Sequence, residues 1–327
     1  MGGIMADKTP VKIVGDQLVM GPVTVGFQRT LRIPEAGLHY LPPGLGRFPL
    51  RRVQDYPDTA PAGWLARGGV MLPIYQREAM WLSFDAAEPA ALQIGVGKVC
   101  AVSGLPWFEH LVKDPQNYVV LPDQPWLDGI NAGDGFIRQF VAVPLGSGAT
   151  VEGQVTGQEA HGGVQLRAVG LTEEALEAWR AAHRMVAFDM APMACPDAIG
   201  SADMGLGAGG RMRQEVYTDG RPLADYDEGG AQRVFVHLCS AAQWTANTGE
   251  VPPPTPVDRD AYVSAGLPWF DYYDADARDL APSQILAKVK TVGEKLGGEE
   301  EPFLPVDPKT VVKLGDAGSD AVPDGTW

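Results

Sequence analysis

Apolar residues recur at every second position over much of the first half of the chain, which is the period of a half-buried β-strand. Residues 92–99 follow this alternation, and residues 136–143 form a β-branched and aromatic run that ends at Pro144. Similar runs occupy residues 11–14, 17–20, 78–84, 151–155 and 164–169. Gly15 and Asp16 separate the first two of these like a hairpin turn. These seven runs are the clearest of the at least eight strands that we predict before residue 170.

Helical patterns lie in the second half of the chain. Residues 172–184 begin with a capping Thr172, carry two glutamates in the first turn and end with two arginines, which suits the helix dipole. Residues 191–230 are rich in Gly, Pro and Asp and predict a long irregular segment. The other predicted elements are a strand at 232–238, a helix near 240–248, a helix from Thr255 to Gly266 and an amphipathic helix at 283–296.

The pattern as a whole predicts a mainly β fold, a β-sandwich or distorted barrel with a few peripheral helices, toward α+β. The 40 glycines and 28 prolines among 327 residues supply the many turns that such a fold requires. We expect residues 1–250 to form a β-rich core domain. Residues 251–327 would add a proline spacer, helices and an acidic tail, packing on the core or on a neighbour.

Charge narrows the possible partners. The formal net charge of −15 repels phosphate backbones and anionic membrane surfaces, so we expect neither nucleic acid nor membrane as a partner. The N-terminus lacks a signal-peptide pattern, and three scattered cysteines fit a reducing compartment, so we expect a cytoplasmic protein with buried thiols. The five histidines show no metal-ligand spacing, and no cofactor motif is present, so we predict neither metal nor cofactor.

The most conspicuous candidate site is the glycine-rich stretch 205–213. Consecutive glycines let backbone N–H groups converge on an anion, and two arginines can clamp it. The alternative is a flexible or tightly turning loop without a ligand. The candidate binding residues of this stretch are Gly207, Gly209, Gly210, Arg211 and Arg213.

A second candidate site combines Trp126, Asp128 and Arg138. A tryptophan ring stacks on the apolar face of a sugar, and a carboxylate accepts hydroxyl hydrogen bonds. The alternative is a surface turn with a buried Trp126 and an Asp128–Arg138 ion pair. His161, followed by two glycines, either lines a pocket or is simply exposed, and we favour exposure.

Several stretches together resemble a family of uncharacterised bacterial proteins to which no activity is attached. They are residues 41–49, 124–129 with 137–140, 205–214 and 266–271. The resemblance implies one coherent globular unit and assigns no functional residue. One of these stretches, Gly266 to Asp271, also echoes residues 104–109 within the chain, where a Pro-Trp-Phe turn would place aromatic rings in the core.

Two function classes remain open. Because no catalytic motif is recognisable, we favour a non-enzymatic binding or self-assembling protein, with a homo-oligomer formed through the C-terminal tail. The alternative is a hydrolase or lectin-like protein that acts on a glycan or a small polar or anionic ligand at the two candidate sites.

Overall fold

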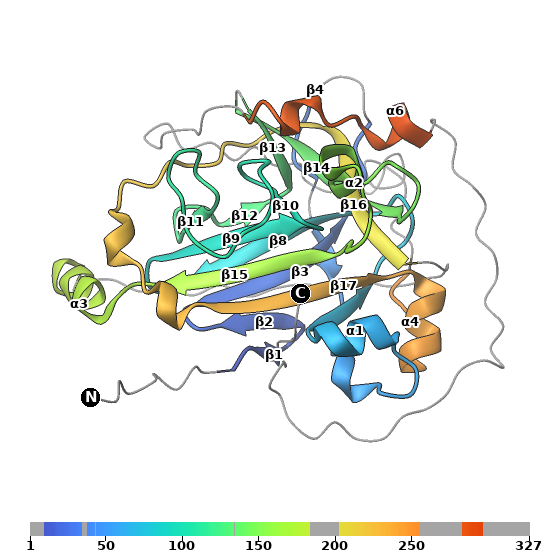
Figure 1. Ribbon diagram of the computed structural model, residues 1–327, viewed down its shortest axis with the longest axis horizontal. Helices are drawn as coiled ribbons and strands as arrows, with labels where there is room; N and C mark the ends of the chain where they lie inside the picture. Colours follow the sequence, from blue (N-terminus) through green and yellow to red (C-terminus); the bar gives the residue numbers. More distant parts are fainter. Residues whose placement is uncertain are drawn as a thin grey trace.

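The computed structural model describes residues 10–34, 38–42, 44–133, 135–183, 203–254 and 283–296. Within these ranges the chain is mainly β, with one large sheet of mostly antiparallel strands and short helices around it (Figure 1). This confirms the predicted fold class. No helix in these ranges combines the length and apolarity needed to cross a bilayer.

The strands are β1 (Lys12–Val14), β2 (Gln17–Met20), β3 (Val23–Thr30), β4 (Leu38–His39), β5 (Gly44–Arg47), β6 (Arg51–Arg52), β7 (Val70–Pro73), β8 (Ala79–Ala86), β9 (Ala90–Val96), β10 (Val99–Cys100), β11 (Val119–Leu121), β12 (Trp126–Leu127), β13 (Gly129–Gly133), β14 (Phe136–Pro144), β15 (Val164–Gly170), β16 (Asp203–Arg213) and β17 (Gln232–Cys239). The helices are α1 (Ala62–Arg67), α2 (Val151–Thr156), α3 (Glu173–Ala182), α4 (Ala241–Thr248) and α6 (Val292–Leu296), with 3-10 turns η1 (Val53–Asp55), η2 (Leu223–Asp225), η3 (Glu228–Gly230) and η4 (Leu286–Lys288).

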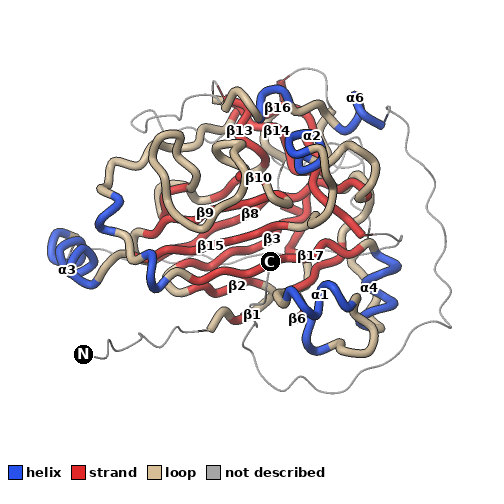
Figure 2. The backbone as a smooth tube through the Cα atoms, viewed as in Figure 1, coloured by secondary structure: helices blue, strands red, loops and turns tan. Residues whose placement is uncertain are grey.

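The sheet folds back on itself around one core. Antiparallel pairing runs β1–β2–β3–β8–β14–β16–β17–β15–β9, while β4 and β7 join in parallel to β16 and β17. Phe27 and Leu82 from the first half of this path share one buried cluster with Ile94, Leu166 and Val236 from the second half. Figure 2 shows the strands stacked across the centre, with α1 and α4 at one end of the molecule and α3 at the opposite end.

The strongest local patterns are confirmed. β1 and β2 form a hairpin whose two turn residues, Gly15 and Asp16, have φ of 55° and 58°, the left-handed pair that a two-residue turn needs. The Thr172 hydroxyl caps α3 by accepting from the Ala175 N–H at 3.3 Å. Cys100 and Cys239 are free and buried, as expected, and Cys195 lies outside the described residues.

The strand predicted at 151–155 is wrong, because these residues form α2. Local capping overrides the apolar alternation: the Thr150 hydroxyl accepts from the Gly153 N–H at 2.9 Å, and Gly157 ends the helix in the left-handed conformation with φ of 76°. This change places Glu152 in the first turn of a helix, where it is buried.

The loop predicted at 205–213 is also wrong, because this stretch belongs to β16, which pairs with β14 along most of its length. Its glycines serve close packing between strands. A Cβ on Gly209 would lie 2.6 Å from the Cγ2 of Val141, and one on Gly210 would lie 2.2 Å from the carbonyl oxygen of Pro34. Residues 191–202 of the predicted irregular segment lie outside the described residues.

The helix predicted at 283–296 is broken into η4 and α6, with Val289 in an extended conformation between them. The predicted apolar face is nevertheless used, since Leu286, Val289 and Val292 are buried. Backbone anchors fix the segment to the core: Arg138 donates to the carbonyl oxygen of Val289 at 2.8 Å. The helix predicted from Thr255, the second Pro-Trp-Phe stretch and the acidic tail lie outside the described residues.

Candidate functional site

The predicted Trp126–Asp128 site is occupied by the protein's own groups. Asp128 is only 2% exposed, and its carboxylate accepts from the Gln214 side-chain amide at 3.0 Å, while the Gln214 carbonyl accepts from the Asp128 N–H at 2.9 Å. Burial raises the pKa of Asp128 to about 7, against the opposing hydrogen bonds from Trp126 and Gln214. The Trp126 ring packs edge-on against Trp81.

The other predicted site residues lie on the adjacent strands β14 and β16, where Arg138 is the register partner of Arg211. Arg138 donates to Val289 and lies 4.0 Å from the Glu294 carboxylate, rather than pairing with Asp128. Gly207, Gly209 and Gly210 are buried in β16, whereas Arg211 and Arg213 are exposed on that strand. The Arg211 guanidinium lies 4.5 Å above the Phe136 ring. Ligand binding at these residues stays a prediction.

A cavity of about 230 Å³ lies elsewhere, between α1, β17 and the loop 157–163. It is lined by residues from distant parts of the chain, and its walls combine aromatic, apolar and basic side chains. They include Trp64, Arg67, Leu145, His161, Met204 and His237.

Stacked rings form one wall of the cavity. Trp64 of α1 stacks on His237 of β17 with ring centroids 4.5 Å apart, and Phe235 lies 4.5 Å from the same imidazole. His237 is 2% exposed, and its Nε2–H donates to the Gly68 carbonyl oxygen at 2.9 Å. Burial lowers the pKa of His237 to about 3, so this imidazole is neutral at physiological pH.

Arg67 supplies a positive charge at the cavity. Its guanidinium lies 4.9 Å above the Phe235 ring, and it makes no hydrogen bond or ion pair with any described residue. Partial burial lowers the pKa of Arg67, an effect opposed by the Glu152 carboxylate. An arginine stays charged under such a shift, so the cavity holds a cation whose five donors are not used by the described protein groups.

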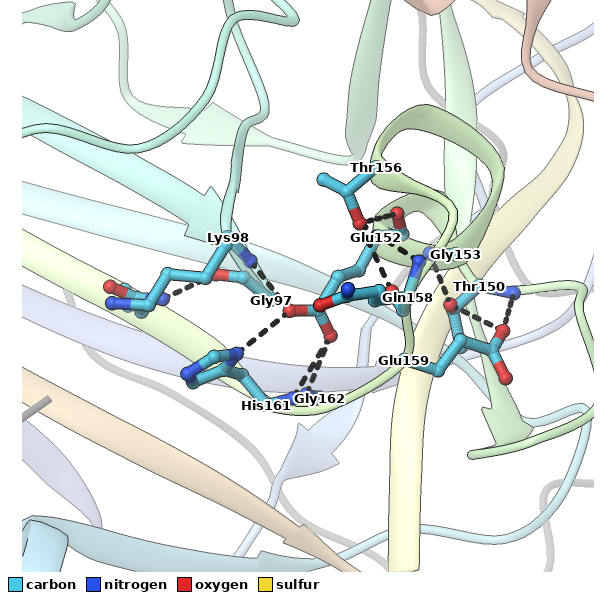
Figure 3. A network of polar contacts seen from close by, with 11 residues as sticks. Gly97, Lys98, Thr150, Glu152, Gly153, Thr156, Gln158, Glu159, His161 and Gly162 are labelled. Carbon is cyan, nitrogen blue, oxygen red and sulfur yellow. Dashed lines mark hydrogen bonds and ion pairs between the residues drawn. The ribbon is translucent and has the colours of Figure 1, made fainter.

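Glu152 and His161 form a polar network at the cavity edge (Figure 3). The Glu152 carboxylate, 3% exposed, accepts from the backbone N–H groups of Lys98 at 3.2 Å, His161 at 3.2 Å and Gly162 at 3.0 Å. The His161 Nδ1 lies 3.1 Å from the same carboxylate. Because a carboxylate accepts and cannot donate, Nδ1 carries the proton and Nε2 keeps its lone pair.

The surroundings keep His161 neutral. Burial lowers the pKa of His161 below its usual range, and the positive charges of Lys98 and Arg67 lower it further, against the Glu152 carboxylate, which raises it. The imidazole is therefore unprotonated at neutral pH, with a proton-accepting nitrogen on the edge that points away from Glu152 in Figure 3.

Glycines make this geometry possible. Gly163 has φ of 62°, and a Cβ there would lie 2.5 Å from the Val236 carbonyl oxygen, so only glycine lets the loop lie against β17. Gly97 has φ of 57°, and an added Cβ at this position would lie 2.5 Å from the Glu152 carboxyl carbon. Gly163 thus lets the loop that carries His161 pack on β17, and Gly97 leaves room for the Glu152 carboxylate.

Sequence reasoning raised His161 as a pocket residue but favoured exposure, and the structure places it at the cavity with 27% of its side chain exposed. It missed Trp64, Arg67 and His237, whose positions in the chain carry no recognisable motif. The glycine pair after His161 was the one usable signal. Among the described residues, no group of three or more His, Cys, Asp or Glu side chains could hold a metal ion.

Comparison of the chain with protein-family models, with curated proteins and with solved structures gives no match. The function is therefore argued from the side chains at the cavity alone.

Proposed function

We propose that this protein binds a small organic anion in the cavity between α1, β17 and the loop 157–163. The observation that carries the proposal concerns Arg67. Its guanidinium lines the cavity, and its positive charge is not matched by an ion pair with any described residue. Partly desolvating a cation that has no direct ion-pair partner costs free energy, and a bound carboxylate or phosphate would offset that cost.

Two further features support this ligand class. Lys98 and Arg67 both act electrostatically on His161, so the cavity is a basic site on a chain of formal net charge −15. Trp64, Leu145 and Met204 line the same space and suit a flat or apolar group beside the anion. The volume of about 230 Å³ limits the ligand to a small molecule such as an aromatic acid.

The test is calorimetric titration of the purified protein with benzoate and phenyl phosphate, and with benzamide as the uncharged control. We expect the two anions to bind and benzamide to bind at least tenfold more weakly. Arg67→Met removes the charge but keeps a long apolar side chain, and should weaken anion binding about 10- to 150-fold, the equivalent of a charged hydrogen bond of about 1.5–3 kcal/mol.

Arg211→Met is the matched control. Arg211 also lies over a phenylalanine ring, but it does not line the cavity. Unchanged anion affinity in Arg211→Met supports the cavity. If Arg211→Met removes binding and Arg67→Met does not, the ligand sits on β16 and the proposal is wrong; the proposal also fails if neither anion binds the wild-type protein.

A further inference from the structure

We infer that Glu152 and His161 form a general base at this cavity, and that the protein hydrolyses the acyl ester of a small phenol that also carries a free carboxylate, by activating a water molecule. The inference rests on the proposed function, because Arg67 would hold the carboxylate of the substrate while His161 acts beside it.

The geometry of the pair has the parts that a general base requires. The Glu152 carboxylate is fixed by three backbone N–H groups at 3.0–3.2 Å, so it can hold the His161 ring in one orientation and one tautomer. The Glu152 carboxylate lies 3.1 Å from Nδ1 of His161, which leaves Nε2 of His161 as the proton acceptor. Glu152 is thus a positioning residue, and His161 is the catalytic residue.

Water is the nucleophile that fits the cavity. The described residues that line it include no serine, threonine or cysteine, so no side chain is placed to attack the substrate and form an acyl intermediate. A cavity of about 230 Å³ has room for a small aromatic ester and a water molecule.

The proposed step balances without any further reactant. One O–H bond of water breaks, its proton passes to Nε2 of His161, and the water oxygen forms a new bond to the acyl carbon. The bond from that carbon to the leaving phenol oxygen then breaks, and the proton on Nε2 returns to this oxygen. The products are a carboxylic acid and a phenol, and His161 is again neutral.

The charges around His161 set the expected pH dependence. Glu152, Lys98 and Arg67 act on the imidazole electrostatically, and neutral His237 shares the cavity with it. Because the pKa of His161 lies below its ordinary value, the unprotonated base is already dominant at pH 7. The rate should therefore rise with pH only on the acid side of neutrality and then level off.

The test uses 4-acetoxybenzoate, whose leaving group carries the carboxylate, and 4-acetoxybenzamide as its uncharged partner. We expect saturable hydrolysis of the ester bond of 4-acetoxybenzoate. The kcat/KM for hydrolysis of the ester bond of 4-acetoxybenzamide should be at least tenfold lower. His161→Gln should lower kcat for 4-acetoxybenzoate by about 10²- to 10⁴-fold, the usual contribution of a general base, while benzoate affinity changes less than threefold.

Three variants separate the roles. His183→Gln, at an exposed histidine that stacks on Trp179, should leave kcat unchanged. Arg67→Met should raise KM for the anionic ester and leave the rate with 4-acetoxybenzamide unaltered. Glu152→Asp should lower kcat and shift the pH dependence of kcat. Nitrogen NMR of His161 in this variant should show loss of the single Nδ1–H tautomer. If Glu152 has only a structural role, the pH dependence of kcat will not shift.

The inference fails if the wild-type protein does not hydrolyse 4-acetoxybenzoate above the buffer rate, or if His161→Gln retains the wild-type kcat. In either case benzoate binding that depends on Arg67 would still stand, so the two proposals fail separately. Equal kcat/KM for the charged and uncharged esters would also overturn it, because Arg67 would then play no part.

Discussion

The contribution of His237 to the stability of this protein should fall in mild acid. Its folded-state pKa is about 3, against an ordinary value of 6.5 that applies to the unfolded chain. Below pH 6.5 the unfolded state therefore binds a proton that the folded state does not, and folding loses stability as the pH falls. Above pH 6.5 both states are neutral at this position, and the contribution is constant.

The size of the effect follows from the shift. The full difference of about 3.5 pKa units corresponds to about 5 kcal/mol, reached only below pH 3. Between pH 8 and pH 5 only part of it develops, about 2 kcal/mol. This is a large fraction of the stability of an ordinary domain, so it is measurable by urea unfolding at both pH values.

The variant that removes this titration is His237→Gln, whose side-chain amide can still donate to the Gly68 carbonyl oxygen. It should lower stability at pH 8 because the stack on Trp64 is lost, but its stability at pH 5 relative to pH 8 should be about 2 kcal/mol higher than that of the wild type. Glu78 and Asp128, whose pKa values burial raises to about 7, act in both proteins and cancel in the comparison.

A matched control comes from the other Trp–His stack. His183 and Trp179 stack at 4.8 Å and 19°, much as His237 and Trp64 do at 4.5 Å and 23°, but His183 is exposed. His183→Gln should therefore keep the wild-type difference between the two pH values. The reasoning is refuted if the free energy of unfolding changes by the same amount between pH 8 and pH 5 in His237→Gln and in the wild type, or if NMR shows His237 taking up a proton near pH 6.5.

Two further substitutions test the packing and the buried carboxyl. Gly163→Ala should destabilise the fold by at least 2 kcal/mol more than Gly157→Ala, as measured by urea unfolding. Both glycines have positive φ, but only at Gly163 would an added Cβ clash with the backbone, 2.5 Å from the Val236 carbonyl oxygen. Equal losses of stability in the two variants would contradict the clash. Asp128→Asn should reduce the stability that the wild type loses as pH rises from 4 to 8, by up to about 4 kcal/mol, because the folded-state pKa of about 7 lies above the ordinary 3.8. Unfolding curves at both pH values check this, and an unchanged pH dependence would show that Asp128 ionises normally.

The sheet was predictable because its strongest signals are local. The run at 136–143 is rich in β-branched and aromatic residues and ends at a proline, and it forms all of β14 except its last residue. The two misassigned segments failed for a different reason. At 151–155 the cap at Thr150 and the stop at Gly157 outweighed the valines, and in β16 glycine marked close strand packing rather than a turn.

The cavity was not predictable from the sequence in the same way. Arg67, His161 and His237 are separated by long stretches of chain, and only the pairing of β15 with β17 and of β17 with β7 brings their segments together. Nothing at any one of these positions distinguishes a cavity residue from an ordinary surface or core residue. The candidate residues chosen from composition, such as Asp128 and Arg138, are instead bonded to the protein itself.

The segment 283–296 has a consequence for the order in which the molecule forms. Leu286, Val289 and Val292 are at most 3% exposed, and the segment is hydrogen-bonded to Ser103, Arg138 and Gln154, far earlier in the chain. During synthesis these earlier residues emerge first, so the apolar surface that η4 and α6 cover is open to water and to other chains until the segment arrives. Chaperone dependence in the cell should therefore concentrate on this end of the sheet, late in translation.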